Sequence, residues 1–539
     1  MVLKNVARGR GHLVHSHAHE EGIPGTVNLQ AAEGDDTVYG MALFPVPAED
    51  PNDPLQWSNF KKTMILIICS FYSFLANASI IGPSPYLDLW AEEFDISPTK
   101  ASELVSYPNL AFGFGSLIFV PLYLKYGRRP VMLFSLATFA AGLIGASRCT
   151  SFGGLMAARV VHGFGSCVCE ALPVQLVNDI FFLHERGKRI GYYTVCLCLG
   201  TFASLPAGYM LSGGYGWRLF FYVEFAFAVA LLILAFIFVE ETSYDRRVLA
   251  APSTPPNEPE KERAHEIEKG TEPADLIVPP RKSFLETLSL RGRVDSDVPF
   301  FTTMIRSFTY FLVPQSLWVI TTFGINIGLS ALSFSYTFPI LITSPPYNWT
   351  VTNSGLFALA AVVGYGLAVP FTSSSDRLAA FFTKRNNGIR EAEMRLGVMV
   401  IPMIVGPAGI VLYGLTAERG LHWICFFIGG AMNYWAAYFY FSFTLAYAVD
   451  SYYANTSEML IAMNIGKQII SFGFGLKVLT WVLESGYGVV MSGIFAGVLL
   501  ANNLVLIIFM VWGKRIRIFL SQTWLARFHF RSIREVTTH

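Results

Sequence analysis

Long apolar runs separated by short polar segments dominate this 539-residue chain. Each run has about the twenty residues that a helix needs to cross the hydrocarbon core of a bilayer. Twelve runs fall near 64–85, 103–124, 131–149, 153–183, 190–211, 219–239, 311–342, 353–372, 396–415, 421–448, 458–482 and 487–512. The pattern predicts an all-α, polytopic membrane protein with twelve transmembrane helices.

A polar, proline-rich stretch from Thr242 to about Asp297 divides the runs into six and six, and we expect it to bury no core of its own. Gly115 and Pro121 in the second run recur as Gly364 and Pro370 in the eighth, as a repeated half would produce. The predicted parts are a tail (1–60), a six-helix bundle (61–242), a linker (243–305), a second six-helix bundle (306–515) and a second tail (516–539).

Composition agrees with the membrane class. Hydrophobic residues make up 53% of the chain and charged residues 14%, whereas soluble proteins carry about a quarter charged residues. The net charge of +1 gives no basic field for nucleic acid. Seven cysteines, nearly all in or beside apolar runs, predict no disulfide framework and no zinc site. His12, His15, His17 and His19 are better explained as a solvated tail than as a metal site, and no cofactor is expected.

Basic residues in the short loops predict the orientation. One side carries Lys125, Arg128, Arg129, Arg186, Lys188, Arg189, Arg377, Lys384, Arg385, Arg390 and Arg395, and the other has only Lys100, Arg148, Arg218 and Arg419. Both tails and the linker should therefore lie in the cytosol, with the plasma membrane as the expected location and the vacuolar membrane as the alternative. We expect the first span, and no cleaved signal, to direct insertion. Asn348 is the one sequon in an outward loop and is a candidate glycosylation site.

Several motifs resemble those of the major facilitator superfamily. Residues 121–130 (PLYLKYGRRP) resemble its loop between spans two and three, and 159–165 (RVVHGFG) its fourth-span motif. Residues 52–57 (NDPLQW) are similar to a signature of fungal twelve-span drug:proton antiporters. Residues 345–348, 385–389 and 393–396 resemble the branch that includes fungal cation and polyamine carriers.

The resemblance implies two six-helix bundles that rock around a cavity at the middle of the membrane. It also implies gating or motif roles for Arg128, Arg129, Arg159, Asp179, Arg186 and Lys467, the last as a gate or counter-ion. Two positions depart from the pattern. Leu124 stands where the family has an acid, which predicts an under-latched cytosolic gate in the first half. The antiporter motif of span five is reduced to Gly200, Pro206 and Gly208, so the direction of transport stays open.

Glu170 is the leading candidate for proton coupling or cation binding. A carboxylate at that depth costs on the order of 3 kcal/mol in hydrocarbon unless it faces a cavity, a proton path or a ligand. On an ideal helix it shares a face with Arg159, Gly163 and Ser166 but lies about 16 Å from Arg159, too far to pair. A base or hydroxyl on another helix is the alternative. Glu224 is the second candidate, with simple solvation as its alternative.

Polar and aromatic residues near mid-span are expected to line the cavity. Tyr434 and Tyr438 lie one turn apart in ring-rich span ten and could hold an amine by cation–π attraction. Ordinary packing is the alternative for any ring on an apolar helix. The other predicted lining residues are Tyr72, Asn77, Ser166, Asn326, Tyr336 and Asn433.

The sequence therefore predicts a secondary transporter, proton-coupled and monomeric, for a small organic solute such as an organic cation or polyamine. One alternative is efflux of a neutral drug or secondary metabolite. Another is a transporter-like receptor that senses a solute without moving it. The chain carries no P-loop, Gly-x-Ser-x-Gly or His-Glu-x-x-His motif, so we do not expect an enzyme.

Overall fold

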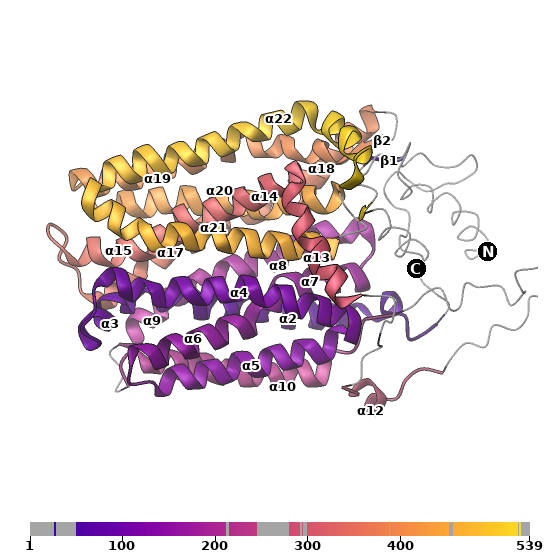
Figure 1. Cartoon of the computed structure of the whole chain (residues 1–539), viewed down its shortest axis with the longest axis horizontal. Coiled ribbons are helices and arrows are strands. Elements are labelled where there is room, and N and C mark those ends of the chain that lie inside the picture. Colours follow the sequence, from indigo (N-terminus) through magenta and orange to yellow (C-terminus); the bar gives the residue numbers. More distant parts are fainter. Residues whose placement is uncertain are drawn as a thin grey trace, which may run out of the picture.

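The computed structural model describes residues 26–28, 50–211, 215–244, 280–290, 294, 299–386, 389–451, 456–525 and 528–529. Within them, long helical segments run side by side along the longest axis of the molecule (Figure 1). The histidine-rich tail, residues 245–279 of the predicted linker and the end of the chain lie outside the described residues. At the N-terminal ends of three segments a serine side chain accepts a main-chain N–H: Ser58, Ser97 and Ser151.

The first half consists of six segments, several of them interrupted by a 3-10 turn. They are α2 (Asn59–Ile81) with η3 (Ser84–Tyr86) and α3 (Leu87–Glu93), α4 (Pro98–Tyr126), α5 (Arg128–Arg148), α6 (Phe152–Ser166) with η4 (Cys167–Cys169) and α7 (Ala171–Ile180), α8 (Leu183–Leu199) with η5 (Gly200–Ala203) and α9 (Ser204–Met210), and α10 (Arg218–Phe238).

The second half repeats this organisation. Its segments are α14 (Pro314–Ile325) with η7 (Asn326–Leu332) and α15 (Ser333–Thr343), α16 (Val351–Ser354) with η8 (Gly355–Phe357), α17 (Ala358–Ala368), η9 (Val369–Phe371) and α18 (Ser374–Arg385), η10 (Ala392–Val400) with α19 (Pro402–Arg419), α20 (Ile424–Ser451), α21 (Thr456–Ser485), and η12 (Gly488–Phe495) with α22 (Ala496–Ser521).

Eleven of these segments are long and apolar enough to cross a membrane. The remaining one, α20, has 28 residues. Its tyrosines, tryptophan and asparagine lower its mean hydropathy, although its length matches the others. The predicted all-helical architecture with twelve spans in two bundles is confirmed, because each predicted run coincides with one of these segments.

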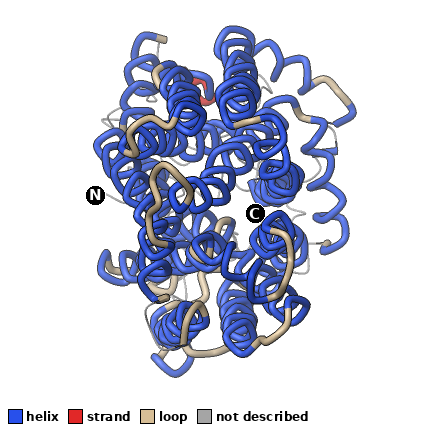
Figure 2. Tube along the Cα trace, turned by 90° about the vertical axis from the view of Figure 1, so that its left-hand side faces the viewer, coloured by secondary structure: helices blue, strands red, loops and turns tan. Residues whose placement is uncertain are grey.

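The two halves pack against each other over the length of the molecule (Figure 1), and Figure 2 views the helices from one end. Helices α4 and α21 form one line of contact between them, while α8 and α9 face α20, α17 and η8 along another. Tyr336 on α15 hydrogen-bonds Ser106 on α4 at 2.9 Å. A cavity that lies between the halves is therefore bounded by helices from both.

Shorter elements gather at one end of the molecule, which we call the linker end. There β1 (Thr26–Asn28) pairs antiparallel with β2 (Ile389–Glu391), and α13 (Phe300–Thr309) leads into η6 (Tyr310–Leu312). The C-terminal segment reaches back to α13, because the His529 ring stacks on Tyr310 at 4.4 Å and lies 2.7 Å from the Thr309 hydroxyl. Burial beside Arg306 lowers the pKa of His529 to about 4.

Part of the predicted linker packs on the first bundle. Residues 280–290, which we call the linker strap, contain the short helix α12 (Phe284–Thr287). Asn52 holds the start of the strap through its contacts with the Pro280 carbonyl and the Lys282 amide, at 3.1 and 3.0 Å. The described side chains of the strap are mostly exposed, in line with the prediction that the linker buries no core, but its main chain supplies carbonyls to the buried Arg129 guanidinium.

Candidate functional site

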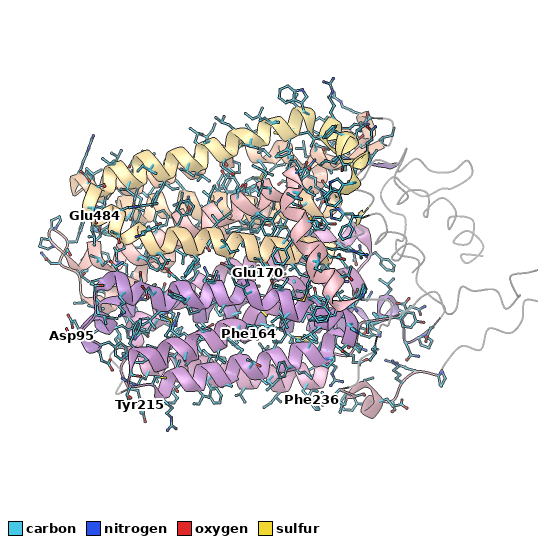
Figure 3. The ribbon with its side chains drawn as sticks, in the orientation of Figure 1. Asp95, Phe164, Glu170, Tyr215, Phe236 and Glu484 are labelled. Carbon is cyan, nitrogen blue, oxygen red and sulfur yellow. The ribbon has the colours of Figure 1, made fainter. Side chains whose placement is uncertain are left out.

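A cavity of about 100 Å³ lies between the two halves and contains the predicted Glu170. Figure 3 places Glu170 near the middle of the long axis. Asp95 and Glu484 lie toward the end opposite the linker end, which we call the far end, and Phe236 lies toward the linker end. The first half contributes Asn77, Ile81, Asn109, Glu170, Tyr193, Thr194, Leu197, Cys198 and Thr201. The second half contributes Phe323, Ile327, Ala331, Tyr365, Phe441, Leu445, Leu460, Met463, Asn464, Lys467 and Gln468.

Glu170 sits at a break in its transmembrane segment. Helix α6 ends at Ser166, a 3-10 turn follows, and α7 begins after Glu170. Pro173 has no N–H to donate to the Cys169 carbonyl, four residues earlier, and a proline interrupts a helix for this reason. Ser73 on α2 donates to that carbonyl instead, and Tyr193 on α8 donates to the Glu170 carbonyl at 3.0 Å. The break is thus stabilised from two neighbouring helices.

The break overturns the ideal-helix alignment of Glu170 with Gly163 and Ser166. Ser166 is fully buried and its hydroxyl donates to the Gly163 carbonyl at 2.9 Å, so it does not line the cavity. A Cβ on Gly163 would lie 2.4 Å from the Pro108 carbonyl oxygen. This glycine therefore permits close packing of α6 on α4 and leaves no room for a solute.

Lys467 on α21 donates to the Glu170 carboxylate, forming an ion pair between the two halves. Glu170, for which the sequence offered no partner on its own helix, is thus paired with a base on another helix. Lys467 is 3% exposed, and its ammonium also faces the Phe323 ring at 5.7 Å. The Glu170 side chain is 18% exposed. The pair therefore lies on the cavity wall, with the carboxylate more accessible than the ammonium.

The polar groups on the two walls differ in kind. On the first half, Asn77 donates its amide to the Leu197 carbonyl at 2.8 Å, while Thr194 and Thr201 donate to carbonyls of their own helix. Their donors are therefore occupied by main chain. On α21, Gln468 accepts from Ser471 at 3.1 Å through its side-chain oxygen, which leaves its amide nitrogen free of partners among the described residues.

Of the predicted lining residues, Asn77 lies on the cavity and the others lie elsewhere. Tyr72 hydrogen-bonds Ser135 and the Gly165 carbonyl and joins three helices inside the first half. Tyr336 bonds Ser106, as described above. Asn326 and Asn433 donate to carbonyls of the second half, at 2.8 and 3.4 Å.

Tyr434 and Tyr438 of α20 are also not among the residues that line this cavity. Tyr434 packs against Phe334, Phe357 and Tyr365 nearer the far end, and Tyr438 packs beside Phe439 and Phe443. Phe441 and Leu445 are the residues of α20 that line it. The cation–π cage predicted from Tyr434 and Tyr438 is therefore wrong in its residues, because the cavity meets α20 further along the same face, at Phe441 and Leu445.

Glu224 on α10 is 6% exposed and lies outside the cavity. Its Oε2 atom has no hydrogen-bond partner among the described residues. The alternative that Glu224 is merely solvated is therefore wrong. Glu170, and not Glu224, is the carboxylate among the residues that line the cavity.

At the far end, Arg159 ties three helices of the first half together. Its guanidinium donates to the main-chain carbonyls of Leu104, Ser79 and Ile80, and it lies 5.5 Å from the Trp90 ring. The halves also approach closely there. A Cβ on Gly355 would lie 2.2 Å from the Ser204 carbonyl oxygen, so only glycine permits this contact between η8 and α9. Asn348 is exposed in the loop at the same end.

At the linker end, a charge network closes the first half without position 124. Arg128 pairs with Asp179 at 3.1 Å. The carboxylate of Glu241 accepts the main-chain amides of Arg128 and Arg129 at 3.0 and 3.1 Å. The Arg129 guanidinium donates to carbonyls of the linker strap at Thr287 and Ser289 and to Phe236. Arg186 caps the end of α7 by donating to the carbonyls of Asn178 and Phe181.

The prediction that Leu124 leaves this gate short of partners is therefore wrong. The sequence comparison considered only the acid within the loop, whereas Asp179, Glu241 and the strap approach from other segments. The second half has an equivalent network in which Arg395 pairs with Asp376 at 2.7 Å and with Asp450. Beside it, Arg517 pairs with Glu391 and Glu393, at 2.8 and 2.6 Å.

Hydrogen bonds outside the membrane spans strengthen this second network. Burial opposes ionisation of Glu391, but hydrogen bonds from Lys514, Arg517 and Thr26 outweigh it and hold the pKa of Glu391 below its usual value. Thr26 belongs to β1, so the N-terminal strand contributes to the charge network of the second half. The acids at the ends of spans eight and ten, Asp376 and Asp450, were the sequence signal for this arrangement.

The family model of the Major Facilitator Superfamily matches residues 66–476. The chain belongs to this superfamily. An uncharacterised MFS-type transporter of Schizosaccharomyces pombe is 24% identical, with 92% of this chain and 93% of that protein covered. Protein HOL1 of Saccharomyces cerevisiae is 23% identical, with 96% and 98% covered.

The fold of this superfamily member also resembles solved structures. The proton:xylose symporter XylE superposes with a TM-score of 0.57 at 13% identity, over 84% of this chain and 96% of that one. Major facilitators are membrane transporters of small solutes, built from two bundles around a central site. The cavity between the halves, with its Glu170–Lys467 pair, thus lies where a major facilitator binds its solute.

Proposed function

We propose that this major facilitator is a proton-coupled secondary transporter of a small organic solute that carries an ammonium group. The observation that carries the proposal is the Glu170–Lys467 ion pair, which joins the two halves beside the cavity. A proton on Glu170 removes its charge and weakens the contact between the halves. Proton binding and the relative movement of the halves therefore act on the same bond.

The solute competes with the proton and with Lys467 for the Glu170 carboxylate. A carboxylate that is 18% exposed to the cavity can accept a proton, the Lys467 ammonium or a solute ammonium. Breaking a buried ion pair costs about 3–5 kcal/mol if nothing replaces the lost partner. Opening without a proton or solute is accordingly unfavourable, and this is the condition for coupled transport.

An organic cation or polyamine is the solute class we favour for the ammonium group, in line with the motifs that resemble fungal cation and polyamine carriers. The second candidate is efflux of a neutral drug or metabolite. The apolar part of the lining supports it, since Phe323, Tyr365, Phe441, Ile327 and Leu445 offer rings and alkyl groups to an uncharged molecule.

We place the linker end in the cytosol, because the basic loops lie there. The protein then has both tails and the linker inside and Asn348 outside, where it is open to glycosylation. Its bundles are bounded near 61–242 and 306–515, and it acts as a monomer in the plasma membrane, with the vacuolar membrane as alternative. Cysteine labels at Asn348 and in the linker near Gly270 should react from opposite sides of sealed cells.

Transport in sealed vesicles with an imposed pH gradient of either sign tests the proposal. Labelled polyamines and drug-like amines should move against their concentration gradient only when a proton gradient is imposed. Glu170→Gln should abolish this dependence, and Glu170→Asp should retain part of it. Lys477→Gln is the control for the loss of a charge outside the ion pair, since Lys477 is exposed on the helix that carries Lys467, the partner of Glu170. Gradient-driven transport by Glu170→Gln at the wild-type rate would refute the role of Glu170.

A further inference from the structure

The cavity presents acceptors on one wall and donors on the other. On the first half, the Glu170 carboxylate is joined by the amide oxygens of Asn77 and Asn109. The amide nitrogens of these asparagines already donate to the Leu197 carbonyl at 2.8 Å and to the Ser471 hydroxyl at 3.5 Å. Among the described residues their oxygens accept no hydrogen bond, so they remain available to a ligand.

The opposite wall is a single face of α21. Asn464, Lys467 and Gln468 follow one another at helical spacing and all three line the cavity. The Asn464 amide nitrogen is buried without a hydrogen-bond partner in the described part of the chain, and Asn464 is 4% exposed. Gln468 has its oxygen occupied by Ser471. This wall therefore offers an ammonium and amide N–H groups.

A ligand that binds the charged groups of both walls competes with the Glu170–Lys467 pair. A simple amine would replace Lys467 at the carboxylate but would leave an ammonium that is 3% exposed without a counter-charge. A simple acid would leave Glu170 unpaired in the same way. A diamine would add a second cation beside Lys467. Uncompensated buried charge is strongly unfavourable, so each of these ligands satisfies only half of the cavity.

We propose that the solute is zwitterionic, with an ammonium group that binds Glu170, Asn77 and Asn109 and a carboxylate that binds Lys467 and Gln468. Such a solute exchanges one ion pair for two and leaves neither protein charge unpaired. The class is that of small amino acids. This inference rests on the proposed function, because it concerns the same cavity and keeps the solute ammonium at Glu170. It replaces the organic cation or polyamine that the motifs favour, since such a cation leaves Lys467 without a counter-charge.

Binding to the purified, full-length protein in lipid nanodiscs tests the inference with probes of one carbon-chain length. The probes are butylamine, butanoate, 1,4-diaminobutane, 2-aminobutanoate and 4-aminobutanoate, and the dissociation constants are compared at one pH. At least one aminobutanoate should bind about tenfold or more tightly than every single-charge probe and the diamine. Equal or tighter binding of butylamine or the diamine would overturn the inference, and so would absence of binding by both aminobutanoates.

A variant links the preference to the proposed contact. In Lys467→Gln the preference for the aminobutanoate over butylamine should fall to within about threefold, because the cation that reads the carboxylate is gone. Lys477→Gln should keep the full preference. An unchanged preference in Lys467→Gln would overturn the assignment. If the probes fail to discriminate while Glu170→Gln abolishes gradient-driven transport, the solute class is wrong and the proton-coupling function stands.

Discussion

Replacing Lys467 by methionine removes the cation and leaves Glu170 facing the cavity alone. Replacing Glu170 by glutamine leaves the ammonium of Lys467, which is 3% exposed, without its counter-charge. Loss of one partner from a buried pair costs about 3–5 kcal/mol. We expect Glu170→Gln to lie in that range and Lys467→Met to cost less, about 2 kcal/mol, because the carboxylate is 18% exposed and reaches the cavity.

The double variant Glu170→Gln/Lys467→Met should recover most of this loss. It removes both charges together, and such replacement of a buried pair is often close to neutral. The interaction term of the double-mutant cycle should therefore be about 2 kcal/mol or more. The free energy of unfolding is measured by titration with sodium dodecyl sulfate in mixed micelles, with recovery of the folded protein checked on dilution.

The control cycle combines Glu170→Gln with Lys477→Met on the same helix. Lys477 is exposed and has no ion pair among the described residues, so the two effects should add to within about 0.5 kcal/mol. Additive effects of Glu170→Gln and Lys467→Met would mean that the two charges do not stabilise each other. That result would refute the reasoning from which the coupling mechanism was built.

Three further predictions concern the linker end. Asp179→Asn should increase the accessibility of a cysteine probe in the loop after α4, because it removes the partner of Arg128, whereas Leu124→Asp should leave accessibility within error of wild type. Asn52→Ala should loosen the linker strap, so that trypsin cleaves after Arg281 several times faster in inside-out vesicles, and an unchanged rate would argue that the strap is held by other contacts. His529 has a folded pKa of about 4 against an ordinary value of about 6.5, so the C-terminal segment should stay docked at neutral pH and become more sensitive to proteolysis as pH falls through this window. His529→Phe, which cannot be protonated, should remove that dependence.

The twelve spans could be predicted because the length of an apolar run and the thickness of a bilayer are fixed independently of tertiary structure. The depth of Glu170 followed from the same count. Its partner did not, since nothing in a single sequence places Lys467 opposite Glu170 across two halves. The sequence did contain the cause of the broken helix, because Pro173 cannot donate to the Cys169 carbonyl.

The lining of the cavity was the least predictable part. Helix α20 is buried on most of its circumference, so its hydrophobic pattern does not reveal which face meets the other half. Tyr434 and Tyr438 share a helix face with Phe441 and Leu445, so a count of residues could not show at which depth along α20 the cavity lies. The charge networks were missed for a related reason. Arg395 was counted only as a topology signal, and the resemblance gave Arg128 and Asp179 gating roles without pairing them, although each arginine pairs with an acid at the end of a different span.

The docked linker strap limits how far the two bundles can move apart. A chain extends by at most about 3.6 Å per residue, so the free segment from Tyr244 to Phe300 would allow the ends to separate by roughly 200 Å. Because Arg129 holds the Ser289 carbonyl at 2.9 Å, the connecting segment begins at Ser289, and the maximum separation of its ends falls to about 40 Å. Insertions within 245–279 should then leave the range of inter-bundle motion unchanged, whereas a lengthened segment after Ser289 should widen it.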